Sequence, residues 1–515
     1  MNSKVDAQRM EKIVSLCKRR GFIFQSSEIY GGLNGAWDYG PLGVELKRNL
    51  KNYWWRVMVH ERDDVVGMDG SILMNRSVLK ASGHEDTFTD PLVECDVCKR
   101  RFRADQIASP TPVVASISAS FLDKGDNPVG SASMTVGGSS IEDVKRKAKV
   151  QMQYFKPAEA NRSVPFWETS HEQSRVACCP YCGAELSEPR PFNLMFKTYV
   201  GATEDESSIT YLRPETAQSI FVQFKNVLEV SRKKLPFGIA QIGKAFRNEI
   251  NPRNFTFRSR EFEQMELEYF CRPEQGMELL HYWLEQRLRF YENIGIPRQN
   301  LHARDVPDEE RAFYSKGTYD IEYDFPFGRQ ELEGIAYRTD YDLLQHQKAS
   351  GKSLEYFDDE TKQRFVPHVV EPSAGVDRTV LALICEAYSE DEAPDEKGKL
   401  ETRIVLRFHP RMAPIKCAIF PLLKNNAQLV AKAKAIVGLL RPHMNIFYDE
   451  SGAIGRRYRR QDEIGTPFGV TVDFETLGEK DAAVRETVTL RERDSMKQVR
   501  VAIQELPAIL RERIT

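Results

Sequence analysis

The sequence lacks any apolar run close to the roughly 18 residues that a membrane-spanning helix requires. Its first twenty residues are charged and contain no apolar core typical of a secretory signal. The net charge is only −2, which argues against a globally basic nucleic-acid-binding protein. We therefore expect a cytoplasmic protein with no membrane contact, whose nine cysteines remain reduced.

Charge is distributed unevenly along the 515 residues. Residues 404–515 hold 19 Lys and Arg against 13 Asp and Glu, a net charge of +6, which leaves −8 for the rest of the chain. An acidic body joined to a basic tail favours small-molecule chemistry in one part and contact with a polyanion in the other. The length is sufficient for two or three domains.

The N-terminal third is expected to contain two helices and an insertion. The pattern predicts helices at residues 6–20 and 41–60, the second opened by a proline, which is favoured in the first turn. Residues 104–167 are rich in Ser, Pro, Gly and Val and show little periodicity. We expect them to form a partly ordered insertion.

The remainder of the chain is expected to be a mixture of α and β. Strand-like and helix-like segments alternate from 192 to 387, and the acidic segment 389–399 is typical of a linker. A buried strand at 416–422 and an amphipathic helix at 427–440 then predict a small α/β domain.

Residues 237–270 predict a long β-hairpin with its turn at 251–254. Alternation along the second strand places Gln264, Glu266 and Glu268 on one face. Four arginines, at 247, 253, 258 and 260, cluster near the turn. The hairpin is either an exposed element stabilised by ion pairs or a triphosphate site, because guanidinium groups bind phosphate bidentately and an interleaved aromatic ring can stack on a base.

Three segments resemble the motifs of class II aminoacyl-tRNA synthetases, in the order typical of that family. Residues 38–43 (Asp-Tyr-Gly-Pro-Leu-Gly) and the helix after them resemble motif 1. Phe-Arg-Asn-Glu at 246–249 with Arg-x-x-x-Phe at 258–262 resembles motif 2, and Glu-Pro-Ser-Ala-Gly-Val-Asp-Arg at 371–378 resembles motif 3. The His-Ile-Gly-His and Lys-Met-Ser-Lys-Ser signatures of the class I enzymes are absent.

Within class II the chain is most similar to the homodimeric glycyl-tRNA synthetases. The similar segments are 213–218 (Arg-Pro-Glu-Thr-Ala-Gln), 262–266, 331–338 and the motif 3 stretch. The resemblance implies an α/β (α+β) fold, with an antiparallel sheet flanked by helices as the catalytic core and a C-terminal α/β anticodon-binding domain.

The resemblance further implies a catalytic domain at 1–400 and an anticodon-binding domain at 401–515, with a zinc-ribbon-like insertion at 95–182. The implied partners are glycine, ATP and tRNA(Gly), and the chain would be a homodimer. Glycine's carboxylate would attack the α-phosphate of ATP, and the terminal ribose of the tRNA would then attack glycyl-adenylate. Because the substrates supply the nucleophiles, catalysis would consist of positioning and charge stabilisation.

The resemblance implies an ATP site with three catalytic residues, Arg247, Glu249 and Arg378. Arg247 would hold the α-phosphate and Glu249 the adenine amino group, while Phe262 and Arg378 sandwich the base. Glu331 would help to hold Mg²⁺, which prefers oxygen ligands, although from the sequence alone it could equally be a solvated carboxylate. The implied ATP-binding set is Arg247, Asn248, Glu249, Phe257, Arg258, Phe262, Glu331, Leu332, Gly375 and Arg378.

A glycine site must hold an ammonium group and exclude a methyl group, because glycine has no side chain to be recognised. Carboxylates suit the first task, and we expect Glu268 to matter less than Glu215. Rejection of larger amino acids is steric, so we expect no editing site. The implied glycine-binding set is Arg103, Glu215, Phe262, Glu263, Gln264, Glu266, Arg338, Glu371 and Ser373.

Two Cys-x-x-Cys pairs, Cys95 with Cys98 and Cys179 with Cys182, have the spacing of zinc knuckles. The residues between the pairs number far more than the roughly 15–20 that usually separate such pairs. The four thiols therefore form either a structural Zn²⁺ site or two turns with free, reduced thiols.

The tail contains four arginines around a tyrosine, at 456, 457, 459 and 460. They form either a solvated loop or an RNA-binding surface, since arginine beside an aromatic ring suits phosphates and unstacked bases. The resemblance to anticodon-binding domains favours Arg456, Arg457, Arg459 and Arg460 as tRNA-binding residues.

Three other interpretations remain. The chain could be a class II enzyme for threonine, proline or histidine, against which the segments at 213–216 and 371–373 argue. It could be a non-catalytic, synthetase-like accessory subunit that binds nucleic acid, but such a protein is expected to lose Arg247, Glu249 or Arg378. A zinc-ribbon RNA-binding module would explain the cysteines but not the three motifs.

Overall fold

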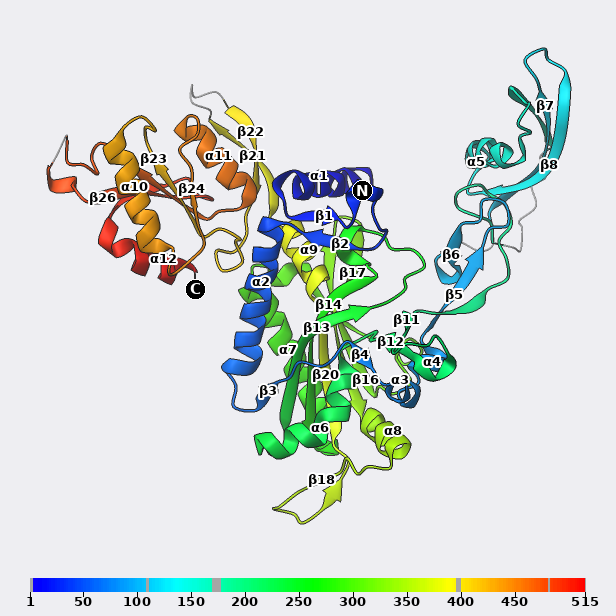
Figure 1. Cartoon of the computed structure of the whole chain (residues 1–515), viewed down its shortest axis with the longest axis horizontal. Helices are drawn as coiled ribbons and strands as arrows, with labels where there is room; N and C mark the ends of the chain where they lie inside the picture. The colour runs from blue at the N-terminus through cyan, green and yellow to red at the C-terminus, as the bar shows by residue number, and fades with distance from the viewer. Residues whose placement is uncertain (1–2, 108–110, 169–176, 395–399, 480–481, 515) are drawn as a thin grey trace. The chain divides into compact units, whose positions relative to one another are not determined.

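The structure is a computed structural model that describes residues 3–107, 111–168, 177–394, 400–479 and 482–514 (Figure 1). Its contacts divide the chain into two units. The first unit comprises Met1–Ser82, Lys197–Phe246 and Arg253–Thr515, and the second comprises Gly83–Phe196 and Arg247–Pro252. Among the described residues, no helix is both long and apolar enough to cross a membrane.

A seven-stranded sheet forms the centre of the first unit, in the order β15-β16-β17-β20-β14-β13-β3. Its pairings are antiparallel except for the parallel edge pair β13–β3. The strands are β3 (Val65–Gly67), β13 (Phe237–Phe246), β14 (Glu261–Cys271), β15 (Leu301–Asp305), β16 (Gly317–Phe325), β17 (Gly328–Thr339) and β20 (His368–Gly375).

Alternation along β14 separates two hydrophobic clusters, one on each face of this sheet. Met265 and Leu267 face a large core that includes side chains of four helices, whereas Phe270 faces a second cluster with two helices. The helices of the first cluster are α1 (Ser3–Arg20), α2 (Pro41–Trp55), α7 (Gly276–Asn293) and α9 (Val376–Ala387). Those of the second are α6 (Ala217–Ser231) and α8 (Tyr341–Ser350).

The predicted N-terminal helices and the hairpin are confirmed. Helix α1 covers 6–20, and α2 begins at Pro41 and continues through the π-helical turn Arg56–His60. Strands β13 and β14 pair over ten residues, but their connection runs from 247 to 260. The predicted turn at 251–254 is therefore only part of a longer loop.

Short elements complete this part of the first unit. They are β1 (Ile23–Gln25), β2 (Trp37–Tyr39), β4 (Leu73–Met74), α3 (Arg76–Ala81), β11 (Lys197–Tyr199), β12 (Ile209–Leu212), β18 (Tyr356–Phe357) and β19 (Arg364–Phe365). The predicted linker at 389–399 is wrong for its first half, because β21 (Tyr388–Pro394) pairs antiparallel with β22 (Leu400–Leu406). Residues 395–399 lie outside the described residues.

A five-stranded sheet follows, in the order β24-β23-β25-β26-β27. It confirms the predicted C-terminal α/β domain, since β23 begins one residue after Lys416 and α10 matches the predicted helix. The elements are β23 (Cys417–Pro421), α10 (Ala427–Leu440), β24 (Ile446–Tyr448), α11 (Ile454–Ile464), β25 (Phe468–Val472), β26 (Thr487–Glu492), β27 (Gln498–Ala502) and α12 (Leu506–Ile514).

The second unit contains two three-stranded sheets, β10-β5-β6 and β8-β7-β9. Its elements are α4 (His84–Thr87), β5 (Thr89–Glu94), β6 (Arg101–Arg103), β7 (Val113–Leu122), β8 (Pro128–Gly138), α5 (Ile141–Phe155), β9 (Arg162–Glu168) and β10 (Arg190–Asn193). The insertion is more ordered than predicted, because alternate β7 residues and α5 form a core of their own. Residues 108–110 of the insertion lie outside the described residues.

Candidate active site

The face of β14 that carries Gln264, Glu266 and Glu268 is buried, as the alternation predicts. Glu266 is 1% exposed and Glu268 is 0% exposed. Antiparallel pairing places Glu266 opposite Ser373 of β20. This arrangement brings acidic side chains from two neighbouring strands to one face of the sheet, on the side of α6 and α8.

Glu266 is held at both carboxylate oxygens. The Thr216 hydroxyl donates to Oε2, and the Ser373 hydroxyl donates to Oε1 at 2.8 Å. Gln264 in turn donates from Nε2 to the Ser373 hydroxyl at 3.3 Å. The carboxylate is therefore fixed in orientation by short hydroxyl side chains, although no basic residue contacts it among the described hydrogen bonds.

Arg338 connects two acidic groups on the same face. Its NH1 lies 2.8 Å from Glu371 Oε2, and its Nε and NH2 bind both oxygens of Asp342 at 2.8 and 2.9 Å. The guanidinium also lies 4.2 Å from the centroid of the Tyr314 ring. A register shift at the end of β17, where Thr339 has a φ of 58°, turns the chain here into α8.

Glu215 joins this cluster through Gln218. The Gln218 amide donates to Glu215 Oε1 at 3.0 Å and to Asp342 Oδ1 at 3.1 Å, and its oxygen lies 2.8 Å from His346 Nε2. The structure thus brings together six of the predicted glycine-binding residues: Glu215, Gln264, Glu266, Arg338, Glu371 and Ser373.

The carboxyl groups of this cluster are too crowded to be fully ionised. Single oxygens of Glu266, Glu268 and Glu371 lie within 4.8 Å of one another. Burial, and then the charge of Glu215, raises the pKa of Glu266. Burial also raises the pKa of Glu371, to about 8, although the charge of Arg338 acts in the opposite direction. Burial, reinforced by Glu371, raises the pKa of Glu268 well above its usual range. Such a site favours a cation as its ligand.

The Glu263 side chain does not belong to this cluster, and its predicted glycine contact stays a prediction. It lies on the opposite face of β14, where Lys47 Nζ contacts it at 2.7 Å and Lys51 Nζ at 2.9 Å. Lys47 also binds Asp377 Oδ1 at 2.9 Å, and the Glu263 backbone N–H donates to Asp377 Oδ2 at 2.7 Å. Odd-numbered positions of β14 face the core helices, so the side chain points away from the glycine pocket.

Three predicted ATP-binding residues lie together near motif 3. The Arg378 guanidinium lies 4.5 Å from the Phe257 ring centroid, and NH1 lies 3.4 Å from Glu331 Oε1. Gly375 ends β20 and precedes α9, which carries Arg378. The Leu332 side chain is wholly buried, so only its backbone is available to a nucleotide.

Further carboxylates adjoin Glu331. Asp320 Oδ1 and Glu331 Oε1 both lie within 4.0 Å of the position that a Cβ on Gly334 would occupy. Burial, and then the charge of Glu331, raises the pKa of Asp320 to about 7. The charges of the two carboxylates repel each other, and carboxylate oxygens are ligands that fit a hard divalent cation such as Mg²⁺.

Four of the remaining predicted substrate residues belong to the second unit, whereas Arg258 and Phe262 belong to the first. Arg247 lies over the Phe88 ring at 5.4 Å, and the Asn248 backbone N–H donates to the Leu194 carbonyl. Arg103 forms an ion pair with Asp90 at 2.7 Å and interacts electrostatically with Glu249. Arg103, Arg247, Asn248 and Glu249 thus share one unit, and their participation in the ATP and glycine sites stays a prediction.

The two cysteine pairs come together in the second unit. The sulfur atoms of Cys95 and Cys182 are 3.5 Å apart and those of Cys98 and Cys179 are 3.7 Å apart. A tetrahedral zinc with Zn–S bonds of roughly 2.3 Å requires sulfur separations of about 3.8 Å, whereas a disulfide would be roughly 2.05 Å. The four thiols therefore fit Zn²⁺.

The tail arginines lie on helix α11, so the alternative of a solvated loop is wrong. Arg457 is 2% exposed, and its guanidinium binds carbonyl oxygens that include those of Gly452 and Pro421. Arg460 pairs with Asp449 at 2.5 Å. The Arg457 side chain therefore stabilises the domain interior, whereas Arg456 is exposed, and the tRNA contacts of the four arginines stay a prediction.

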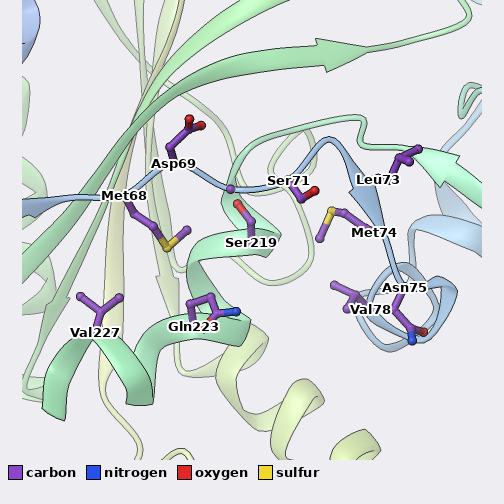
Figure 2. Close-up of a pocket in the computed structure, with 11 residues that line it drawn as sticks. Met68, Asp69, Ser71, Leu73, Met74, Asn75, Val78, Ser219, Gln223 and Val227 are labelled. Atoms are coloured by element: carbon purple, nitrogen blue, oxygen red, sulfur yellow. The ribbon is translucent and has the colours of Figure 1, made fainter. Parts of the chain in front are cut away.

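A separate pocket of about 380 Å³ lies between residues 68–78 and helix α6 (Figure 2). In Figure 2 the Met68 and Met74 side chains point toward α6, while the Asp69 carboxylate points away from it. The described residues that line the pocket include none of the predicted ATP-binding or glycine-binding side chains.

Several site residues have no counterpart in the predicted sets. Thr216 and Gln218 lie in the Arg-Pro-Glu-Thr-Ala-Gln segment, in which only Glu215 was predicted to bind glycine. Glu268 was visible in the alternation of β14 but was expected to be less important than Glu215. Asp342 had no sequence signal, because its position depends on the register shift at the end of β17.

Comparisons with known proteins agree with this geometry. Residues 196–388 match the family described as tRNA synthetase class II core domain (G, H, P, S and T), and residues 416–513 match the family described as anticodon binding domain.

Full-length relatives include proteins named glycine–tRNA ligase. One from Thermobifida fusca is 49% identical over 513 residues, 99% of this chain and 98% of the relative. One from Clostridium acetobutylicum is 51% identical over 99% of both chains, and one from Thermus thermophilus is 48% identical over 99% of both. The class II core, the anticodon-binding domain and this full-length identity place the chain in the family of class II glycyl-tRNA synthetases.

Proposed function

We propose that the chain attaches glycine to tRNA(Gly) in an ATP-dependent reaction that passes through glycyl-adenylate and releases AMP and pyrophosphate. The observation that carries this proposal is the buried cluster of carboxyl groups around Glu266, Glu371 and Glu215, in a chain of this family. A cationic ammonium group is the part of glycine that such a cluster recognises. The substrates supply both nucleophiles, so the protein acts by positioning them.

Glycine recognition combines charge with lack of space. Glu215, Glu266 and Glu371 would face the ammonium group, and Ser373 and Thr216 would keep Glu266 in place. Tyr314, packed over Arg338, restricts the volume on one side of the cluster. Steric exclusion of a side chain is sufficient here, because no natural amino acid is smaller than glycine.

ATP would be bound by the residues that the motifs predict. Arg378 and Phe262 would sandwich adenine. The Phe257 ring packs against the Arg378 guanidinium. Arg258 and Arg378 would reach the γ-phosphate, and the backbone at Leu332 and Gly375 would border the nucleotide. Arg247 would hold the α-phosphate, with Asn248, Glu249 and Arg103 beside it, because a guanidinium stabilises the charge that develops there.

Mg²⁺ would be held by Glu331 together with Asp320, whose oxygens both lie within 4.0 Å of the position that a Cβ on Gly334 would occupy. When bound, such an ion neutralises charge on the phosphates of ATP. In its absence, Arg378 already offsets part of the Glu331 charge through their 3.4 Å ion pair.

A structural Zn²⁺ at Cys95, Cys98, Cys179 and Cys182 is part of the proposal. Both pairs form the same turn, in which a backbone N–H four residues later returns to the carbonyl of the first cysteine: Lys99 to Cys95 at 2.8 Å, and Gly183 to Cys179 at 2.9 Å. Matched turns that present thiols at these separations are typical of zinc knuckles.

The C-terminal domain would contact the anticodon stem and loop. We place the catalytic domain at 1–400, with the zinc-ribbon-like insertion at 95–182, and the anticodon-binding domain at 401–515. Within the latter, Arg456, Arg459 and Arg460 of α11 are the proposed tRNA-binding residues.

We also propose a homodimer located in the cytoplasm. Ile29 is 89% exposed, Tyr30 88% and Leu33 57%, on the loop before the motif 1 helix α2. Adjacent apolar side chains exposed to this extent favour burial against a second copy. None of the nine cysteines, all of which the structure describes, forms a disulfide, which suits a reducing compartment.

Acylation of a tRNA(Gly) transcript with radiolabelled glycine tests the proposed function. We expect ATP-dependent and Mg²⁺-dependent formation of glycyl-tRNA by the full chain. The variant Glu266→Gln, which retains the size of the side chain, should lose most of this activity. Absence of glycyl-tRNA with the wild-type chain, when a control synthetase charges its own transcript in the same buffer, contradicts the proposal.

A further inference from the structure

Glu268 is a completely buried acid with no partner. It lies on β14 two residues after Glu266, on the same face, and is 0% exposed. Neither carboxylate oxygen has a hydrogen-bond partner among the described residues. An ionised carboxylate buried without compensation is strongly unfavourable, and such a group takes up a proton instead.

The charged groups around Glu268 come from four elements. Glu266 on β14 and Glu371 on β20 each place an oxygen within 4.8 Å of one of its own. Arg338 on β17 and Asp342 on α8 act on it electrostatically as well. Arg338 is already bound to Glu371 and Asp342, so it cannot also neutralise a third carboxylate.

We infer that Glu268 is a positioning residue for glycine recognition, a carboxylic acid that stays protonated and donates a hydrogen bond to the carboxylates that face the ammonium group. The inference rests on the proposed glycine site. A protonated carboxyl group is a donor, whereas an ionised one only accepts. Glu266 and Glu371 each have an oxygen within 4.8 Å of a Glu268 oxygen, so a proton on Glu268 offers them a donor that would fix their orientation without adding charge. The pKa of Glu268, raised by burial and by Glu371, has the direction that this role requires.

Two substitutions distinguish a protonated hydrogen-bond donor from an ionised ligand and from a side chain that only fills space. Glu268→Gln keeps the size and a donor but removes the ability to ionise, whereas Glu268→Met keeps the approximate size and removes the donor. Glu266→Gln serves as the comparison for loss of a charged ligand. The Michaelis constants for glycine and ATP are measured by glycine-dependent ATP–pyrophosphate exchange, with Tm recorded for every variant.

We expect E268Q to keep KM for glycine within about threefold of wild type. E268M should raise that KM by about tenfold or more, because the carboxylates lose their donor, while KM for ATP stays within about twofold. If E268Q is impaired as severely as E266Q, Glu268 is an ionised ligand and the inference is wrong. If E268M behaves like wild type, Glu268 only fills space and the inference is also wrong.

Infrared spectroscopy of the full chain provides a readout that does not depend on activity. Wild type at neutral pH should show a protonated-carboxyl C=O band component that is lost in E268Q, and an unchanged band contradicts the inference. This measurement also distinguishes failure of the proposed function from failure of the inference about Glu268. If the chain fails to activate glycine, the proposed function fails, while the infrared band still decides whether Glu268 carries a proton.

Discussion

At the scale of single residues, the acidic side chains of the glycine pocket differ in the charge they can carry. Glu371 contacts Arg338 and yet is buried beside Glu266 and Glu268, so burial raises its pKa to about 8. Glu215 is only partly buried and is held by an amide. A bound ammonium group would therefore favour the loss of a proton from Glu371.

This charge state predicts a pH dependence of glycine binding. A carboxyl group with a pKa raised from 4.5 to about 8 is protonated at lower pH and ionises as the pH rises. Because the ammonium group needs the ionised form, we expect KM for glycine to fall by about tenfold or more from pH 6 to pH 8. Pyrophosphate exchange at saturating ATP measures this. A KM for glycine that does not change over this range contradicts the assignment of Glu371.

Glu263 and Glu266 form a matched pair on opposite faces of one strand. E266Q should raise KM for glycine strongly, with little change in stability. E263Q breaks the ion pairs to Lys47 and Lys51 and should cost roughly 3 kcal/mol of stability, with KM for glycine nearly unchanged. Urea unfolding and exchange kinetics on both variants test this. Equal effects of the two substitutions on KM would contradict the separation of the two faces.

Sequence reasoning located this site well where strand periodicity governs it. The period of two placed Gln264, Glu266 and Glu268 on one face, and it places the Glu263 side chain on the other. Asp342 could not be predicted, because its contact with Arg338 depends on a local register shift. The unpartnered state of Glu268 depends on three-dimensional packing and has no sequence signal.

At the scale of elements, helix α11 carries one arginine that is buried and stabilises the domain and another that is exposed. Arg457 binds backbone carbonyls in the interior, while Arg456 is exposed on the same helix. Four arginines in five residues left a solvated loop and an RNA-binding surface as alternatives, because composition alone does not show which side of a helix is buried. The capping glycine Gly465, with a φ of 84°, ends the helix where the sequence suggested only a turn.

A charge reversal on this helix tests the proposed tRNA contact. R456E combined with R459E should lower tRNA glycylation by about tenfold or more, because reversed charges repel the phosphate backbone. Glycine-dependent pyrophosphate exchange should stay near the wild-type rate. R457M serves as the contrast and should lower Tm. If the double variant loses exchange as well, the proposed division of labour is wrong.

The cysteine cluster gives a second prediction at this scale. Purified chain should contain close to one equivalent of zinc, and C179S should lose the metal because one of four thiolate ligands is removed. C178S is the matched control, since the neighbouring Cys178 does not belong to the cluster. Elemental analysis measures the content. Less than about half an equivalent in the wild-type chain, or equal loss in both variants, would refute the site.

At the scale of the whole molecule, the sequence motifs predicted a class II core followed by an anticodon-binding domain, and the family matches confirm both. The order of the three motifs was sufficient for this, because each marks a separate part of one sheet and its helices. The insertion was harder to predict. Its strand β7 alternates small residues such as Ala115 and Ser116, so its hydrophobic period is weak, and yet it forms a separate core with α5.

The central claim is that this molecule selects glycine through a buried cluster of carboxyl groups and activates it with ATP. Pyrophosphate exchange with a panel of amino acids, including alanine, serine, threonine, proline and histidine, tests it most directly. We predict that glycine supports exchange at a rate at least about a hundredfold above any other amino acid, because a side chain is excluded sterically. Exchange that is faster with another amino acid, or absent with all of them, would contradict the account.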